Sequence, residues 1–190
     1  YPNGISNSWN SGVISYDENQ SQADDYGFTI KMIDWIKTNT RIDENRIFAF
    51  GQSAGAMFLY EQVVSRQHDF AAIAIVMGNY FDCDLSSVKI ERCIDERPIL
   101  YPNQPVSILH IHGQMDNLVP FNGGPVGQSD DLYVKSVYDT ITIISGNSLC
   151  NFEPRIDTFS NGVTRYKYYG CNDFREIVVY AVYSAGHGNF

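Results

Sequence analysis

The segment Gly51-Gln52-Ser53-Ala54-Gly55 has residue types and spacing that could make a serine hydroxyl reactive. It directly follows a short apolar run, 46–50, and directly precedes a segment of helical periodicity, 54–66. A serine on such a strand-to-helix turn lies exposed at a sheet edge and beside a helix N-terminus, which stabilises negative charge. The pattern predicts that Ser53 is a nucleophile and that the Ala54 N–H is one donor of an oxyanion hole. The alternative is an ordinary turn in which the serine caps the helix.

A serine nucleophile needs a base, and the chain has four histidines. His187 lies between two glycines just after the last apolar segment, so its side chain would be free to reach into a cleft. The alternative for His187 is a disordered terminal residue. His68 is expected at a helix end, as a surface or capping residue. His110 and His112 lie on the apolar run 106–111 and point to one face of the expected strand.

The carboxylate that orients this base is predicted at Asp116, just after the stretch 106–113. Catalytic groups in open α/β sheets gather at the carboxyl ends of strands, where Asp116 would accept the Nδ1–H of His187. The order Ser53, Asp116, His187 is the order found in α/β-hydrolases. Two alternatives remain: a simple turn aspartate, or a metal site formed by Asp116 with His110 and His112. We expect neither a metal nor an organic cofactor.

Three short apolar runs predict the strands that must position these groups: 46–50, 71–77 and 106–111. Such runs are typical of strands buried on both faces, as in a parallel sheet covered by helices. Helices are expected from Asp24 to about 38–40, over 54–66 and over 130–144, although 141–144 is strand-like. Strands are also expected over 164–169 and 175–183. The sequence thus predicts an α/β fold with about five strands, in one domain spanning 1–190.

Composition excludes several classes of protein. The chain has 190 residues, 44% of them hydrophobic and 18% charged, which argues against a disordered protein. Its formal net charge of −9 argues against binding to nucleic acid or to an anionic membrane surface. The longest apolar run, from Phe70 to Met77, is far too short to span a membrane.

The four cysteines, Cys83, Cys93, Cys150 and Cys171, allow three pairings. Their separations favour Cys83–Cys93 and Cys150–Cys171, each closing a local loop, in an oxidising compartment. The alternative is four free, buried thiols.

Together these motifs resemble the secreted α/β-hydrolase esterases that include polyhydroxybutyrate depolymerases and feruloyl or acetylxylan esterases. The resemblance covers nearly the whole chain and is carried by residues 1–4, 8–10, 24–28, 41–55, 110–116, 150, 168–171 and 186–187. It implies that Ser53 is the nucleophile, Asp116 the acid and His187 the base. It also implies a Cys150–Cys171 disulfide and an extracellular location.

The chain also departs from this family. Members carry further strands before this point, with a His-Gly loop that supplies a second oxyanion donor. They also have Trp-Pro after Gly186-His187, where this chain has Gly188-Asn189-Phe190, and a final helix. We therefore interpret the chain as a partial α/β-hydrolase domain whose N-terminal strands are missing.

The resemblance implies a serine carboxylesterase acting on feruloyl or acetyl esters of plant polysaccharide, or on polyhydroxyalkanoate. Trp9 and Tyr80 are candidates for lining its substrate cleft, with core or ordinary surface positions as the alternative. Two other functions stay open: a serine peptidase on the same fold, and a truncated domain without activity.

Overall fold

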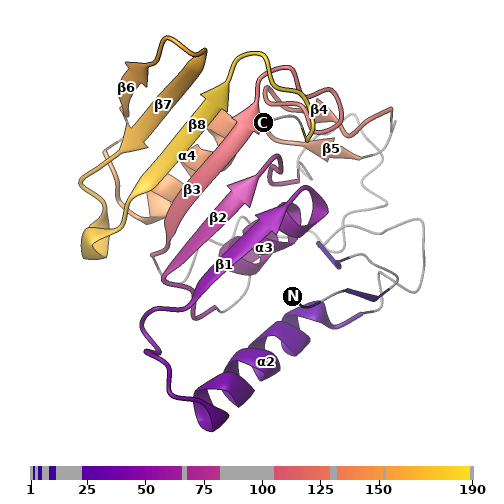
Figure 1. The fold of residues 1–190 in the computed structure, drawn as a ribbon, viewed down its shortest axis with the longest axis vertical. Helices are drawn as coiled ribbons and strands as arrows, with labels where there is room; N and C mark the ends of the chain where they lie inside the picture. The colour runs from indigo at the N-terminus through magenta and orange to yellow at the C-terminus, as the bar shows by residue number, and fades with distance from the viewer. Residues whose placement is uncertain are drawn as a thin grey trace.

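A computed structural model of the chain describes residues 2, 4–5, 9–11, 23–65, 68–81, 105–128, 132–151 and 153–188. In this part of the chain six strands form one sheet, in the order β1-β2-β3-β8-β7-β6 (Figure 1). The parallel strands are β1 (Phe48–Gln52), β2 (Ala72–Val76), β3 (Ser107–Gly113) and β8 (Ile177–Val182). The antiparallel strands β7 (Val163–Tyr168) and β6 (Arg155–Thr158) complete the sheet. The predicted α/β fold with a mostly parallel sheet is confirmed.

Two helices begin where side chains cap their first amides. Asp24 accepts a hydrogen bond from the Gly27 N–H at the start of α2 (Asp25–Asn39). Ser136 likewise caps α4 (Val137–Asn147), so the helix predicted over 130–144 begins later than expected. A two-stranded ribbon of β4 (Gly124–Pro125) and β5 (Tyr133–Val134) precedes α4. The 3₁₀ turn η3 (Asn172–Phe174) connects β7 to β8.

The core lies between one face of the sheet and the helices α3 (Ala54–Ser65) and α4, which are drawn behind the sheet in Figure 1. Burial alternates along β2 and β8, with Ile73, Ile75 and Val179 facing this core. On the other face, Phe48 and Phe50 are 62% and 65% exposed. The expectation of strands buried on both faces is therefore wrong for β1, because in the described part of the chain the helices cover one face.

The Cys150–Cys171 disulfide is present and links the segment after α4 to the segment after β7. The other expected pair, Cys83–Cys93, lies outside the described residues. None of the described helices has the length and apolar character needed to cross a membrane.

Candidate active site

Ser53 occupies a strained turn between the end of β1 and the start of α3. Its φ of 51° lies in the left-handed region, which costs a non-glycine residue about 1–2 kcal/mol. The turn is held by the Ser53 N–H, which donates to the Val76 carbonyl at 2.9 Å, and by the Ala56 N–H, which donates to the Ser53 carbonyl. These hydrogen bonds to β2 and within the first turn of α3 hold Ser53 in its strained conformation. Residues 51–55, the elbow, thus have the geometry of the strand-to-helix turn called a nucleophile elbow.

The two glycines of the motif differ in what surrounds them. A Cβ added to Gly51 would lie 2.5 Å from the Gly55 carbonyl oxygen, so the strand and the helix meet closely here. A Cβ on Gly55 would meet nothing nearer than the Trp9 indole, at 3.9 Å. Gly78, after β2, also lies against the elbow, where a Cβ would be 2.8 Å from the Ser53 carbonyl oxygen. Close packing therefore requires Gly51 and Gly78, whereas Gly55 has room for a side chain.

Two loops at the carboxyl ends of β3 and β8 carry the other candidates and are joined by backbone contacts. The Gln114 N–H donates to the Val182 carbonyl at 2.9 Å, and the Met115 N–H donates to the Ala185 carbonyl at 3.0 Å. Gly113 packs directly against the Ala185 backbone, leaving no space for a Cβ. Because β3 and β8 are neighbours in parallel, these contacts fix Asp116 and His187 on adjacent loops.

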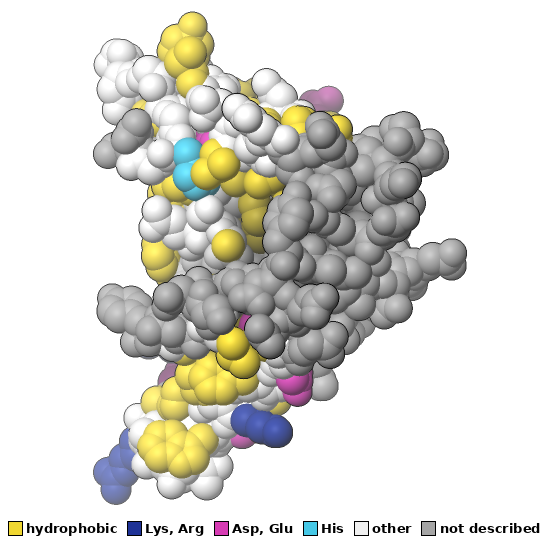
Figure 2. All heavy atoms as spheres, turned by 90° about the vertical axis from the view of Figure 1, so that its right-hand side faces the viewer, with side chains coloured by type: hydrophobic (Ala, Val, Ile, Leu, Met, Phe, Trp, Pro, Cys, Tyr) yellow, Lys and Arg dark blue, Asp and Glu magenta, His cyan; other side chains and the backbone are white. Residues whose placement is uncertain are grey.

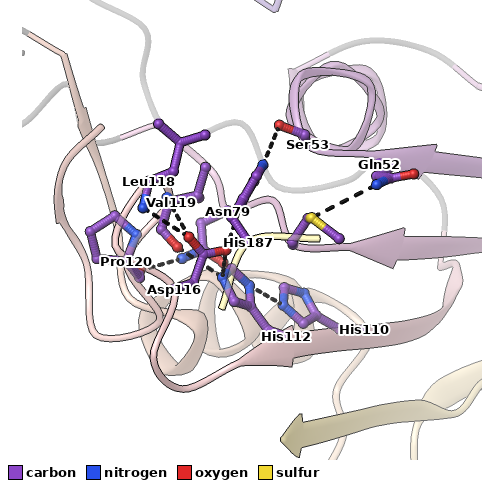
Figure 3. Close-up of polar contacts among 11 residues, drawn as sticks. Gln52, Ser53, Asn79, His110, His112, Asp116, Leu118, Val119, Pro120 and His187 are labelled. Carbon is purple, nitrogen blue, oxygen red and sulfur yellow. Dashed lines mark hydrogen bonds and ion pairs between the residues drawn. The ribbon is translucent and has the colours of Figure 1, made fainter. Parts of the chain in front are cut away.

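The structure brings Ser53, His187 and Asp116 together at this edge of the sheet (Figure 3). The His187 Nε2 lies 3.0 Å from the Ser53 Oγ, and the His187 Nδ1 lies 2.7 Å from the Asp116 Oδ2. A carboxylate can only accept, so Nδ1 carries a proton, and in the neutral form of the ring Nε2 accepts from the serine hydroxyl. This is the hydrogen-bond direction in which a serine can lose its proton to the imidazole.

Asp116 is buried and held from both of its oxygens. Its Oδ1 accepts the backbone N–H groups of Leu118 and Val119, at 2.9 and 2.8 Å, while Oδ2 faces His187. The imidazole, in contrast, reaches solvent: among the described histidines His187 is the one that is not buried. Figure 2 shows histidine at the surface of this face, with hydrophobic side chains beside it. A small molecule could therefore reach the His187 ring from solvent.

His110 and His112 lie on one face of β3 as expected, but both are fully buried. Their rings hydrogen-bond to each other, to the Tyr60 hydroxyl and to the Val119 carbonyl, so their nitrogens are engaged within the protein. Within the described ranges, no group of three or more His, Cys, Asp or Glu residues could hold a metal ion. The helical pattern of 54–66 places Tyr60 in a helix but gives no sign of its contact with His110.

The remaining predicted residues have less distinct positions. Ala54 is the first residue of α3, where backbone N–H groups have no acceptor within the helix. Trp9 stacks on Phe58 and borders the elbow near Gly55, while Tyr80 is partly buried against the core. Of the two expectations for His68, a surface residue or a capping residue, the first is wrong: it is buried, and its Nδ1 accepts the Phe70 N–H.

Comparison with known proteins finds distant relatives that are named esterases. No protein-family model matches it. It is 25% identical over 189 residues to "Probable feruloyl esterase C" of Aspergillus niger, a match that covers 98% of this chain and 55% of that protein. It is 28% identical over 102 residues to the protein of the same name in Aspergillus clavatus, covering 53% of this chain and 32% of that protein. The chain thus spans about half the length of the Aspergillus niger relative, and its match covers about a third of the Aspergillus clavatus relative.

A solved structure agrees in fold. The acetyl xylan esterase from Aspergillus awamori superimposes with a TM-score of 0.56 at 15% sequence identity, covering 87% of this chain and 63% of that one. The resemblance to esterases stated from the motifs is therefore confirmed at the level of distant homology. The chain is a distant homologue of feruloyl esterases and has an α/β-hydrolase-like fold.

Proposed function

We propose that residues 1–190 form a single catalytic domain, or part of one, of a serine carboxylesterase. The observation that carries the proposal is the unbroken line of hydrogen bonds from the Ser53 hydroxyl through His187 to the Asp116 carboxylate, at 3.0 and 2.7 Å. The esterase names of the distant homologues support the same reaction class.

The reaction proceeds through an acyl-enzyme. The Ser53 Oγ forms a bond to the ester carbonyl carbon while its proton passes to the His187 Nε2, and Asp116 stabilises the resulting imidazolium. The carbonyl oxygen becomes an oxyanion, to which the Ala54 N–H at the start of α3 donates. When the intermediate collapses, the C–O bond to the alcohol breaks and His187 protonates that alcohol. Water then attacks the acyl carbon and gives a proton to His187. The bond between this carbon and the Ser53 Oγ breaks as His187 returns the proton to Oγ, and the acid is released.

Feruloyl or acetyl esters of plant polysaccharide are the proposed substrates, since these are the esters named in the relatives and in the solved structure. Exposed apolar side chains of the Asp116 loop, Met115 and Leu118, offer surface for an acyl or sugar group. Trp9, beside the elbow, and Tyr80 remain proposed substrate contacts. An extracellular location is proposed because the Cys150–Cys171 disulfide persists in oxidising compartments.

A substrate panel on the full-length protein tests the proposal. Wild type and Ser53→Ala are compared on p-nitrophenyl acetate, methyl ferulate, acetylated xylan, polyhydroxybutyrate oligomers and a peptide anilide. We expect hydrolysis of the ferulate or acetyl esters, reduced at least about 10⁴-fold in Ser53→Ala. Preferred hydrolysis of the anilide would assign a peptidase, and preferred hydrolysis of the oligomers would assign a polyester hydrolase. Activity that survives Ser53→Ala, or no activity on any substrate, would overturn the proposal.

A further inference from the structure

A buried line of hydrogen bonds connects α3 to the loop that carries Asp116. The Tyr60 hydroxyl lies 2.5 Å from the His110 Nδ1, the His110 Nε2 lies 3.1 Å from the His112 Nδ1, and the His112 Nε2 lies 2.9 Å from the Val119 carbonyl oxygen. None of the three side chains is exposed, and the two imidazoles stack with ring centroids 5.3 Å apart. Two aromatic bases and a phenol in the core would be costly to bury unless every polar atom were paired.

The direction of every hydrogen bond in this line follows from its last member. The Val119 carbonyl can only accept, so the His112 Nε2 must carry the proton. In a neutral ring the His112 Nδ1 is then an acceptor, and the His110 Nε2 must donate to it. The same reasoning leaves the His110 Nδ1 as the acceptor of the Tyr60 hydroxyl proton. The line therefore runs one way, from Tyr60 through His110 and His112 to the Val119 carbonyl.

Burial keeps this assignment stable near neutral pH. It lowers the pKa of His110 well below its ordinary value, with the neighbouring His112 ring adding to the effect. It also lowers the pKa of His112, against the opposing influence of the Val119 carbonyl and of Asp116. Burial raises the pKa of the Tyr60 hydroxyl well above its usual range. Both rings thus stay neutral, and the phenol keeps the proton that it donates.

We propose that His112 is a positioning residue for the carboxylate of Asp116 and that Tyr60 and His110 hold it in the required tautomer. The His112 Nε2 lies 3.4 Å from the Asp116 Oδ2, the oxygen that accepts the His187 Nδ1–H. In the inferred tautomer the Nε2 proton, which is donated to the Val119 carbonyl, also lies near that oxygen and attracts it, whereas in the other tautomer a lone pair would repel it. Phe121 packs edge-on against the His112 ring and restrains its plane. This inference rests on the proposed function, in which Asp116 orients His187.

Kinetics of two His112 variants test the positioning role. His112→Leu removes the N–H that lies between the Val119 carbonyl and Asp116, so we expect kcat to fall roughly tenfold to hundredfold with KM near the wild-type value. His112→Gln can return an N–H to the position of Nε2 and should recover roughly tenfold of that loss. Ile108→Val, a buried change on the same face of β3, is the matched control and should leave kcat unchanged. Equal kcat in the Leu and Gln variants, or a wild-type kcat in His112→Leu, would overturn the proposal.

The tautomers can be measured without any activity. In ¹⁵N-histidine-labelled protein, ring-nitrogen shifts should show His110 and His112 neutral, with the proton on Nε2, between about pH 7 and pH 9. A proton on the His112 Nδ1 would overturn the proposal even if the enzyme is an esterase. Failure of the esterase assignment is detected separately, by activity that survives Ser53→Ala. The spectra also report folding, so they show whether a slow His112 variant is still native.

Discussion

Replacing either glycine of the elbow by alanine should have opposite effects, although the two lie only four residues apart. At Gly51 the new Cβ would be 2.5 Å from the Gly55 carbonyl oxygen and 2.8 Å from the Ala56 nitrogen. These are rigid backbone atoms, so β1 and α3 must separate by about 1 Å to reach ordinary contact. Overpacking of this kind costs about 1–3 kcal/mol. Because Ser53 lies between β1 and α3, their separation moves its hydroxyl relative to His187, and kcat should fall about 100-fold.

At Gly55 the nearest atom to a new Cβ is 3.9 Å away, and the residue lies in the first turn of α3. Alanine there should leave stability unchanged or raise it by up to about 1 kcal/mol, since glycine is the poorer helix former. The assay is urea denaturation of both variants together with kcat on p-nitrophenyl acetate. Equal tolerance of alanine at Gly51 and Gly55 would refute the account of how the elbow is packed.

Three further predictions concern the acid, the buried histidines and the disulfide. Asp116→Asn should retain the fold and lower kcat about 10⁴-fold, because the amide no longer favours the required His187 tautomer; a loss below tenfold would contradict this role. Burial lowers the pKa of His110, so below about pH 6.5 the unfolded chain binds a proton at this residue that the folded protein does not. The free energy of unfolding should therefore not depend on His110 above about pH 6.5, and should fall by at most about 1.4 kcal/mol per pH unit below it. Urea denaturation at about pH 7 and about pH 5 should show this decline, with a smaller slope in His110→Leu; an equal slope would contradict it. Reducing Cys150–Cys171, with its sequence separation of 21, should cost about 3 kcal/mol, and an unchanged melting temperature would contradict this value.

The parts of the fold that the sequence predicts are those with strong local signals. The apolar run 46–50 and the glycine-flanked Ser53 predict the bounds of β1 and α3 to within a few residues. Parallel-sheet geometry predicts that the loops after β3 and β8 lie at one edge of the sheet. The polar strand β6 was not predicted, because Arg155–Thr158 has no apolar alternation and one face is exposed.

Contacts between elements could not be predicted in the same way. Whether His68 is buried depends on what packs over it, which no local pattern records. The partnership of Tyr60 with His110 joins residues 50 positions apart, on a helix and a strand whose relative placement the sequence does not specify. Gly51 has no room for a side chain and Gly55 does, but local periodicity in the sequence cannot distinguish these two glycines.

Covalent labelling of the nucleophile tests the central claim most directly. The full-length protein is treated with a serine-directed aryl phosphonate, and the modified peptide is identified by mass spectrometry while residual esterase activity is followed. We predict one adduct per molecule, on Ser53, formed in proportion to the loss of activity and greatly slowed in Asp116→Asn. Inactivation with the adduct on another residue, or full labelling that leaves esterase activity intact, would contradict the account.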